Sequence, residues 1–200
     1  VKDLMPAVAK RLEDGFLYGD CQYSTDLDGA AEAHPGVFSC YKPVPADTPI
    51  PDNQKRLSAD DWAGLYRLAR TDKKKAFATY SSYYLNTSGQ VYWSDTHQLA
   101  GNFEGYKRAV EAGAGTEMIT EAYVSKDAFV PFMARVRKDY VEHNVDMTYG
   151  TIRFIEKDAE SFLAWAREPS VRIVCNPHVV HTDEGKKKAA EDFRRIIDRA

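Results

Sequence analysis

The sequence predicts an α+β fold, in which an antiparallel sheet carries its helices on one face. Residues 148–156 alternate between apolar and polar side chains, the period of two that is typical of a strand with one buried face. Residues 116–124 and 171–181 are rich in β-branched and aromatic side chains, which predicts two more strands. A segment with apolar residues at helical spacing follows each of these two strands.

Two helices are predicted to pack against these strands. The first follows Ser125 or Asp127 as its cap, and Pro131 fits its first turn. Its apolar stripe consists of Phe129, Phe132, Met133, Val136 and Tyr140. The second begins near Asp183 and runs to the end of the chain. The connection 157–170 is expected to hold a further short helix.

The predicted order of elements over residues 116–200 is therefore β-α-β-β-α. A ferredoxin-like unit has the order β-α-β-β-α-β, with both helices on one face of an antiparallel sheet. The chain ends after the second helix, where the closing strand would begin. We therefore predict a ferredoxin-like half without its closing strand, in a chain cut from a longer protein.

Residues 1–115 are predicted to form an N-terminal α+β half. Residues 1–14 have the pattern of a helix that stops at Gly15, and we expect this helix to be the crossing from an upstream domain. Ser58, with acidic residues after it, marks the start of another helix. Strands are predicted at residues 16–24, 37–42 and 90–95, and further helices from about residue 72 and from residue 102.

Composition and charge argue against several classes of partner. The chain has 27 basic and 30 acidic residues and a formal net charge of −3, which gives no electrostatic reason to expect nucleic acid. No apolar run approaches the ~20 residues of a membrane span, and residues 1–15 lack the apolar core of a signal peptide. Cys21, Cys40 and Cys175 have neither metal-type nor redox-type spacing. We therefore expect a cytoplasmic protein without a membrane span.

Arg153 is the first candidate for chemistry. The alternation puts it on one strand face with Tyr149 and Thr151, away from the apolar face. Its guanidinium offers a rigid fork of donors, which suits an anionic group or a developing negative charge. The alternative is an ion pair with Glu121 or Glu156 at the surface.

His178 and His181 are the second candidate. On a strand, residues three apart point to opposite faces, so the two histidines are not expected to share a metal ion. His178 shares its face with Asn176, and a titrating imidazole there suits the removal of a proton from a substrate hydroxyl. The alternative is an ordinary hydrogen-bonded strand histidine.

Aromatic residues gather between residues 80 and 93, at Tyr80, Tyr83, Tyr84, Tyr92 and Trp93. Such a group can wall an aromatic pocket. The alternative is half-buried packing, which is the commoner use of aromatic stripes.

Several of these segments resemble a known family. Residues 118–124, 148–156 and 176–181 are similar to the substrate or cap domain of FAD-linked oxidases of the vanillyl-alcohol oxidase type, and the similarity extends back to about Gly15. The resemblance implies a FAD-dependent oxidoreductase that oxidises a small alcohol or phenol by hydride transfer to the flavin. It also implies an upstream domain that binds the FAD, because this chain has no glycine-rich phosphate loop.

The resemblance implies roles for individual residues. Related cap domains present an arginine at the place of Arg153, which is therefore expected to contact the flavin and, with His178, to act in catalysis. Tyr149, Thr151 and Asn176 are expected to bind the substrate. Thr151 stands where some relatives, the polyol oxidases, have an acidic residue. The alternative function is a non-enzymatic module that binds a small ligand, because the ferredoxin-like fold hosts many functions.

Overall fold

The computed structural model describes residues 2–27, 34–93, 102–111 and 114–200. Within them the elements are α1 (Leu4–Glu13), β1 (Tyr18–Tyr23), β2 (Gly36–Tyr41), α2 (Ala59–Thr71), α3 (Lys73–Leu85), α4 (Asn102–Glu111), β3 (Gly115–Glu117), β4 (Thr120–Val124), α5 (Phe129–Glu142), β5 (Met147–Ile155), β6 (Ser170–Val180) and α6 (Asp183–Ile197). The predicted α+β class is confirmed.

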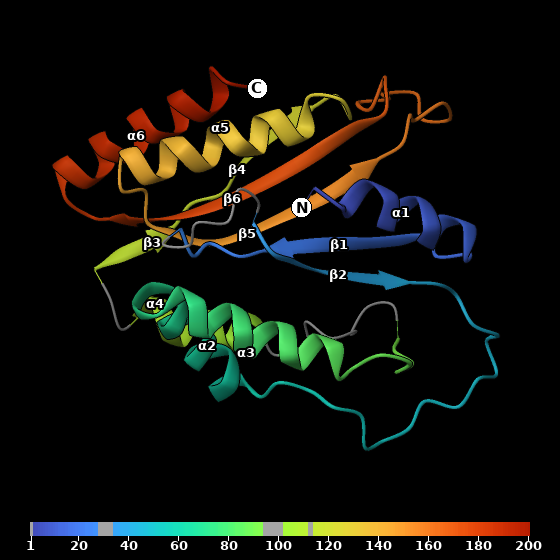
Figure 1. Cartoon of the computed structure of the whole chain (residues 1–200). Helices are drawn as coiled ribbons and strands as arrows, with labels where there is room; N and C mark the ends of the chain where they lie inside the picture. Colours follow the sequence, from blue (N-terminus) through green and yellow to red (C-terminus); the bar gives the residue numbers. More distant parts are fainter. Residues whose placement is uncertain (1, 28–33, 94–101, 112–113) are drawn as a thin grey trace.

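The described strands form one open antiparallel sheet in the order β2-β1-β5-β6-β3. β4 also pairs with β6, along residues 171–175, whereas β3 pairs with residues 178–180. β1 and β5 are joined by two residue pairs, Cys21 with Ile152 and Gln22 with Thr151. Through this short seam the hairpin of the N-terminal part extends the sheet that residues 115–180 build (Figure 1).

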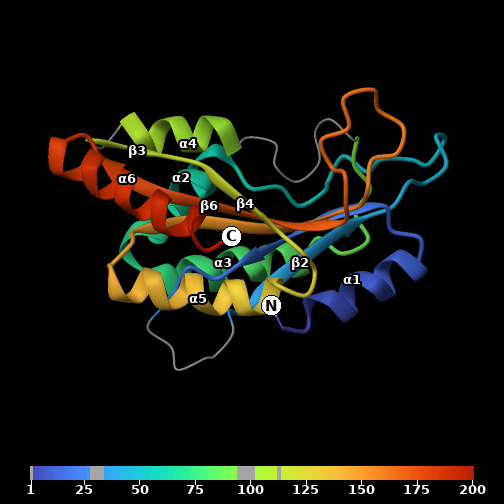
Figure 2. The ribbon, with the colours of Figure 1, turned by 90° about the horizontal axis from the view of Figure 1, so that it is seen from above.

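Helices cover both faces of the sheet. α5 and α6 lie on one face, as predicted for that pair, and α1 lies over the same face beside β1 (Figures 1 and 2). The prediction of helices on one face only is wrong for the sheet as a whole, because α2, α3 and α4 lie against the opposite face (Figure 1). That layer comes from residues 59–111, whose amphipathic helices need a surface on which to bury their aromatic side chains.

Two apolar clusters hold these layers together. The main core fills the space between the sheet and α5, and Phe129 and Phe132 are fully buried there. A smaller cluster of Val37, Trp62, Tyr80 and Tyr84 packs α2 and α3 against β2. The second cluster is almost entirely aromatic, and it forms one wall of the cavities described below.

Local sequence signals explain where the helices start. Ser58 caps α2, because its hydroxyl accepts from the backbone N–H of Asp61 at 3.1 Å while the Asp61 carboxylate accepts from the Ser58 N–H at 2.9 Å. The N-cap of α5 lies one residue after Asp127, the later of the two predicted caps. It is Ala128, which forms no side-chain cap bond, and Ser125 Oγ accepts from the Ala128 N–H at 3.3 Å.

The predicted strand 116–124 is two strands, with a break at Met118 and Ile119. Both strands pair with β6 in the same register, and the break lies opposite Pro177. Proline has no N–H to donate to the ladder, so pairing is interrupted there. Only the Met118 N–H bonds across the break, to the Pro177 carbonyl at 3.0 Å.

Two other predictions of secondary structure are wrong. The connection 157–170 holds no helix, because the Asp158 carboxylate accepts from the backbone N–H groups of Glu160 and Ser161 and fixes a turn instead. Residues 90–93 form no strand, and the Val91 carbonyl accepts from the Gln54 side chain. Residues 94 and 95 of that predicted strand lie outside the described residues.

No helix in the part of the chain that the structure describes is long and apolar enough to cross a membrane.

Candidate functional site

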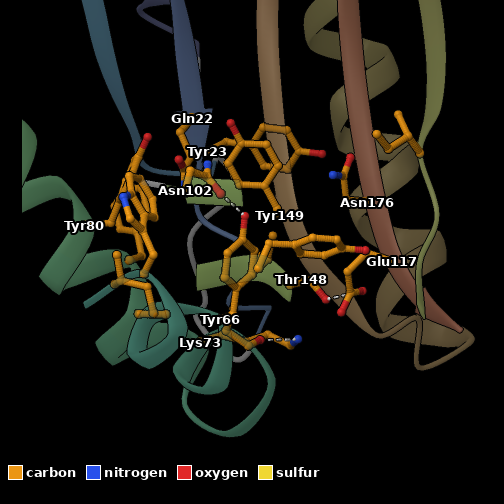
Figure 3. Close-up of a pocket in the computed structure, with 18 of the residues that line it drawn as sticks. Gln22, Tyr23, Tyr66, Lys73, Tyr80, Asn102, Glu117, Thr148, Tyr149 and Asn176 are labelled. Carbon is orange, nitrogen blue, oxygen red and sulfur yellow. Dashed lines mark hydrogen bonds between the residues drawn. The ribbon is translucent and has the colours of Figure 1, made fainter. Parts of the chain in front are cut away.

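An aromatic cavity of about 550 Å³ lies between the sheet and the α2–α4 layer (Figure 3). Most of its wall is aromatic, formed by Tyr23, Trp62, Tyr66, Phe77, Tyr80, Phe103, Tyr106 and Tyr149. Its floor is the sheet face that points away from the main core. A cavity of this size and composition suits a small, flat, mostly apolar molecule.

Two side-chain amides line this aromatic cavity from the two strands that flank β5. Gln22 extends from β1, and Asn176 extends from β6 directly opposite Tyr149. Gln22 Oε1 and Asn176 Oδ1 are buried and accept no hydrogen bond from the described residues. A buried oxygen without a donor costs about 1–3 kcal/mol, so both atoms favour a ligand that brings hydrogen-bond donors.

A β-bulge brings two consecutive residues of β5 to the cavity. Strand residues normally alternate between faces, but the pairing of β5 with β6 shifts register between Met147 and Tyr149. As a result both Thr148 and Tyr149 line the cavity. Burial raises the pKa of the Tyr149 phenol, and the nearby Asp20 adds to this effect. Tyr149 is therefore neutral at physiological pH.

The helical side of the cavity is fixed by two polar contacts. The Tyr66 hydroxyl donates to Asn102 Oδ1 at 2.6 Å and ties α2 to α4 (Figure 3). Burial raises the pKa of Tyr66 to about 12, which keeps the hydroxyl protonated as a donor. At the other end Lys73 Nζ donates to Asp146 Oδ1 at 2.9 Å and to the Met147 carbonyl at 2.6 Å. Lys73 thus clamps α3 to the start of β5 and is not available as a nucleophile.

Arg153 lies in a neighbouring cavity of about 630 Å³, on the same face of β5 as Tyr149. Its walls include Tyr18, Tyr41, Tyr84, Tyr92 and Trp93. The side chain of Arg153 is exposed. Neither of the ion pairs considered as alternatives forms, because Glu121 pairs with Arg172 and Glu156 pairs with Lys126. Among the residues that the structure describes, Arg153 has no hydrogen-bond or ion-pair partner.

His178 lies in a third cavity, of about 440 Å³, on the other side of the aromatic one. Its Nδ1 is 3.1 Å from Glu117 Oε1, and both side chains are nearly buried. Glu117 Oε2 accepts from the Thr148 hydroxyl at 3.2 Å. Glu117 therefore connects the third cavity with the aromatic one, since it lines both.

The structure thus distributes the residues predicted for the site over three adjoining cavities. Tyr149 and Asn176 are together in the aromatic cavity, whereas Arg153 and His178 lie to either side of it. Thr151 is buried between Tyr149 and Arg153 and lines none of the three. The aromatic group is divided too: Tyr80 lines the aromatic cavity, while Tyr84, Tyr92 and Trp93 line the cavity of Arg153.

Sequence reasoning missed several polar residues of these cavities, among them Gln22, Asn102, Glu117, Arg67 and Arg70. Gln22 had a usable signal, because it alternates with Asp20 and Tyr18 on one face of a predicted strand. From sequence alone, a polar strand face is predicted to be exposed to solvent unless another element is known to cover it. Here the covering layer is α2–α4, far from β1 in the sequence.

Comparisons with known proteins add no assignment. No protein-family model matches the chain, and no curated protein matches it significantly.

Proposed function

We propose that this chain is the substrate-binding cap domain of a FAD-dependent oxidoreductase, and that its aromatic cavity holds a small alcohol or phenol. The observation that carries the proposal is an aromatic wall around two buried amide oxygens, of Gln22 and Asn176, that lack donors. A hydroxyl on a flat ring donates to one of these two oxygens, while the ring replaces water on the aromatic wall. The neutral Tyr149 phenol, opposite Asn176, adds a third polar group for orienting that hydroxyl.

The cavity of Arg153 is compatible in its chemistry with the edge of a flavin. A flavin ring is flat and carries carbonyl oxygens, which match aromatic walls such as Tyr84 and Tyr92 and a guanidinium without a partner. When bound, the flavin would accept a hydride from the substrate carbon. The role of this chain would be to orient the substrate through Gln22 and Asn176 and to offer positive charge at Arg153.

The sheet also supports the finer parts of the proposal. β4, β6 and β5 are neighbours in that order, with α5 and α6 on one face, and this arrangement is compatible with a ferredoxin-like half. Cys21, Cys40 and Cys175 are free thiols, which favours a reducing compartment such as the cytoplasm. The upstream FAD-binding domain and the small-molecule substrate are the proposed partners.

The second candidate function is a non-enzymatic module that binds a small aromatic ligand in the same cavity. The same two amide oxygens support it, since they favour binding of a ligand with hydrogen-bond donors whether or not a reaction follows. The absorption spectrum of the purified full-length protein separates the two. We expect a yellow flavoprotein, and a colourless full-length protein without affinity for FAD would leave only the binding module.

A ligand titration tests the cavity itself in either case. We expect the protein to bind phenol at least tenfold more tightly than anisole, whose ether oxygen has no proton to donate; tenfold corresponds to about 1.4 kcal/mol. Asn176→Leu should abolish this preference, whereas Asn53→Leu, at an exposed position outside the three cavities, should keep it. Equal affinity for phenol and anisole in the unmodified protein would disprove the role of the amides.

A further inference from the structure

We propose that the third cavity, between α2 and the paired strands β3 and β6, is a binding site for an oxyanion. The ligand would carry a carboxylate or a phosphate, held by Arg67, Arg70 and His178. This inference goes beyond the oxidoreductase proposal and does not rest on it.

The arginine side of the site follows from helix geometry. Arg67, Arg70 and Thr71 are spaced by three and four residues, so they share one face of α2, and all three line the cavity. Neither arginine forms an ion pair or a side-chain hydrogen bond with any residue that the structure describes. Two arginines without a protein partner therefore line one space, and the planar donors of a guanidinium suit bidentate binding of carboxylate or phosphate.

The opposite wall of the site is rigid. The His178 ring packs on the backbone of β3 at Gly115, where any Cβ would overlap the ring. Glu117 holds the ring at Nδ1, and the pair is nearly buried. The second nitrogen, Nε2, has no partner among the described residues. Because Nδ1 donates to the Glu117 carboxylate, Nε2 accepts from a protonated oxygen of the ligand in the neutral ring and donates to it in the doubly protonated ring.

The charges in the cavity favour an anion. Glu117 is the only carboxylate among the described residues that line it, and both of its oxygens are already engaged, by His178 and Thr148. Two arginines therefore face one carboxylate. The Tyr66 hydroxyl is committed to Asn102 and the Thr71 hydroxyl to the Arg67 carbonyl. The arginines, the Tyr106 hydroxyl and His178 are therefore the polar groups left for a ligand.

Isothermal titration calorimetry of the intact protein tests the site, with inorganic phosphate in one arm and acetate in the other, at constant ionic strength. The test variant is the double substitution Arg67→Gln/Arg70→Gln. The matched control is Arg135→Gln/Arg167→Gln, which removes the same charge from exposed positions outside the cavity. We expect saturable binding of at least one anion to the unmodified protein and to the control, and at least tenfold weaker binding to the test variant.

The two arms identify the ligand class, because tighter phosphate binding assigns a phosphate-bearing ligand and tighter acetate binding a carboxylate. His178→Gln should weaken the same anion at least threefold, measured well below the thermal midpoint of this variant, because the substitution also removes the nearly buried contact with Glu117. Folding of the arginine variant is checked by its own thermal midpoint, since both arginines are exposed. Equal losses in both double variants, or no saturable binding of either anion to the unmodified protein, would overturn the proposal.

Discussion

Arg153 and Arg172 lie directly opposite each other on β5 and β6, and Arg153 lines a cavity together with Tyr84 of α3. In such a pair the Cβ atoms are about 5 Å apart, and like charges destabilise the sheet. Only Arg172 has a carboxylate partner among the described residues, Glu121, which also accepts from the Tyr123 hydroxyl at 2.8 Å. Arg172 therefore contacts Glu121 directly, whereas Arg153 acts on the same carboxylate only through its charge.

Replacing Glu121 tests the repulsion between Arg153 and Arg172. We expect Glu121→Gln to lower the free energy of unfolding by about 1 kcal/mol at low salt and by less at high salt, as for a partly exposed ion pair. The hydrogen bond from Arg172 lowers the pKa of Glu121, so this contribution is present at neutral pH and is lost as the pH falls through that lowered value. In an Arg153→Gln background the same change should cost less. A double-mutant cycle by urea denaturation that gives no coupling would contradict the repulsion.

Substitution of Arg153 itself tests the proposed catalytic role. Arg153→Lys keeps the charge but loses the planar fork of donors. In the proposed oxidoreductase we expect turnover to fall at least tenfold, with the thermal midpoint unchanged because the side chain is exposed and has no hydrogen-bond or ion-pair partner among the described residues. Arg135→Lys, at an exposed position on α5, serves as the control. Unchanged turnover would reduce Arg153 to a surface residue.

His34 should make the protein sensitive to acid. The imidazole is buried, and Nδ1 donates to the Ser24 carbonyl at 2.8 Å. Burial, assisted by the charge of Arg137, lowers the pKa of His34 to about 4 from 6.5. The unfolded chain therefore takes up a proton below pH 6.5, and the folded protein does so only near pH 4.

The resulting loss of stability is about 3 kcal/mol as the pH falls from 6.5 to 4. Urea unfolding measured across this range should show it, on top of the effects of other groups. His34→Gln should flatten that part of the profile, whereas His181→Gln, at an exposed position, should not. An identical slope in both variants would assign the acid sensitivity to other groups.

Gly150 is the position where a single methyl group should do most damage to β5. A Cβ there would overlap the ring of Tyr23, which is almost completely buried against the strand. We expect Gly150→Ala to lower the free energy of unfolding by about 3 kcal/mol, the upper range for an overpacked core. Gly64→Ala, in α2, where an added Cβ would meet only Arg67 Nη2 at 4.0 Å, should instead stabilise by about 0.5–1 kcal/mol. Similar effects of both changes would argue against the close packing of Tyr23.

Local patterns in the sequence predicted most elements of the fold, and tertiary contacts explain the rest. Ser58 and Asp61 form a capping signal that spans four consecutive residues, so the sequence alone predicts the start of α2. The break at Met118 could not, because it depends on Pro177 in another strand. The division of the chain near residue 115 stays a prediction, although strands from both sides of it share one sheet.

The candidate site was predictable only in part, for the same reason. Tyr149 and Asn176 were both expected to bind the substrate, and they do share a cavity. The separation of Arg153 and His178 into other cavities depends on how α2–α4 dock, and no local pattern encodes it. The contact of Glu117 with His178 depends on the register of β3 against β6, which the sequence leaves open.

The seam between β1 and β5 has a consequence for the order of folding. Its two residue pairs join strands that are far apart in the chain, so closing it requires a long loop to be ordered first. The β1–β2 hairpin and the β5–β6 pair are local, and we expect them to form earlier. Gln22 belongs to the seam and lines the aromatic cavity. The cavity is therefore completed only in the last step, and a ligand bound across it should slow the first step of unfolding.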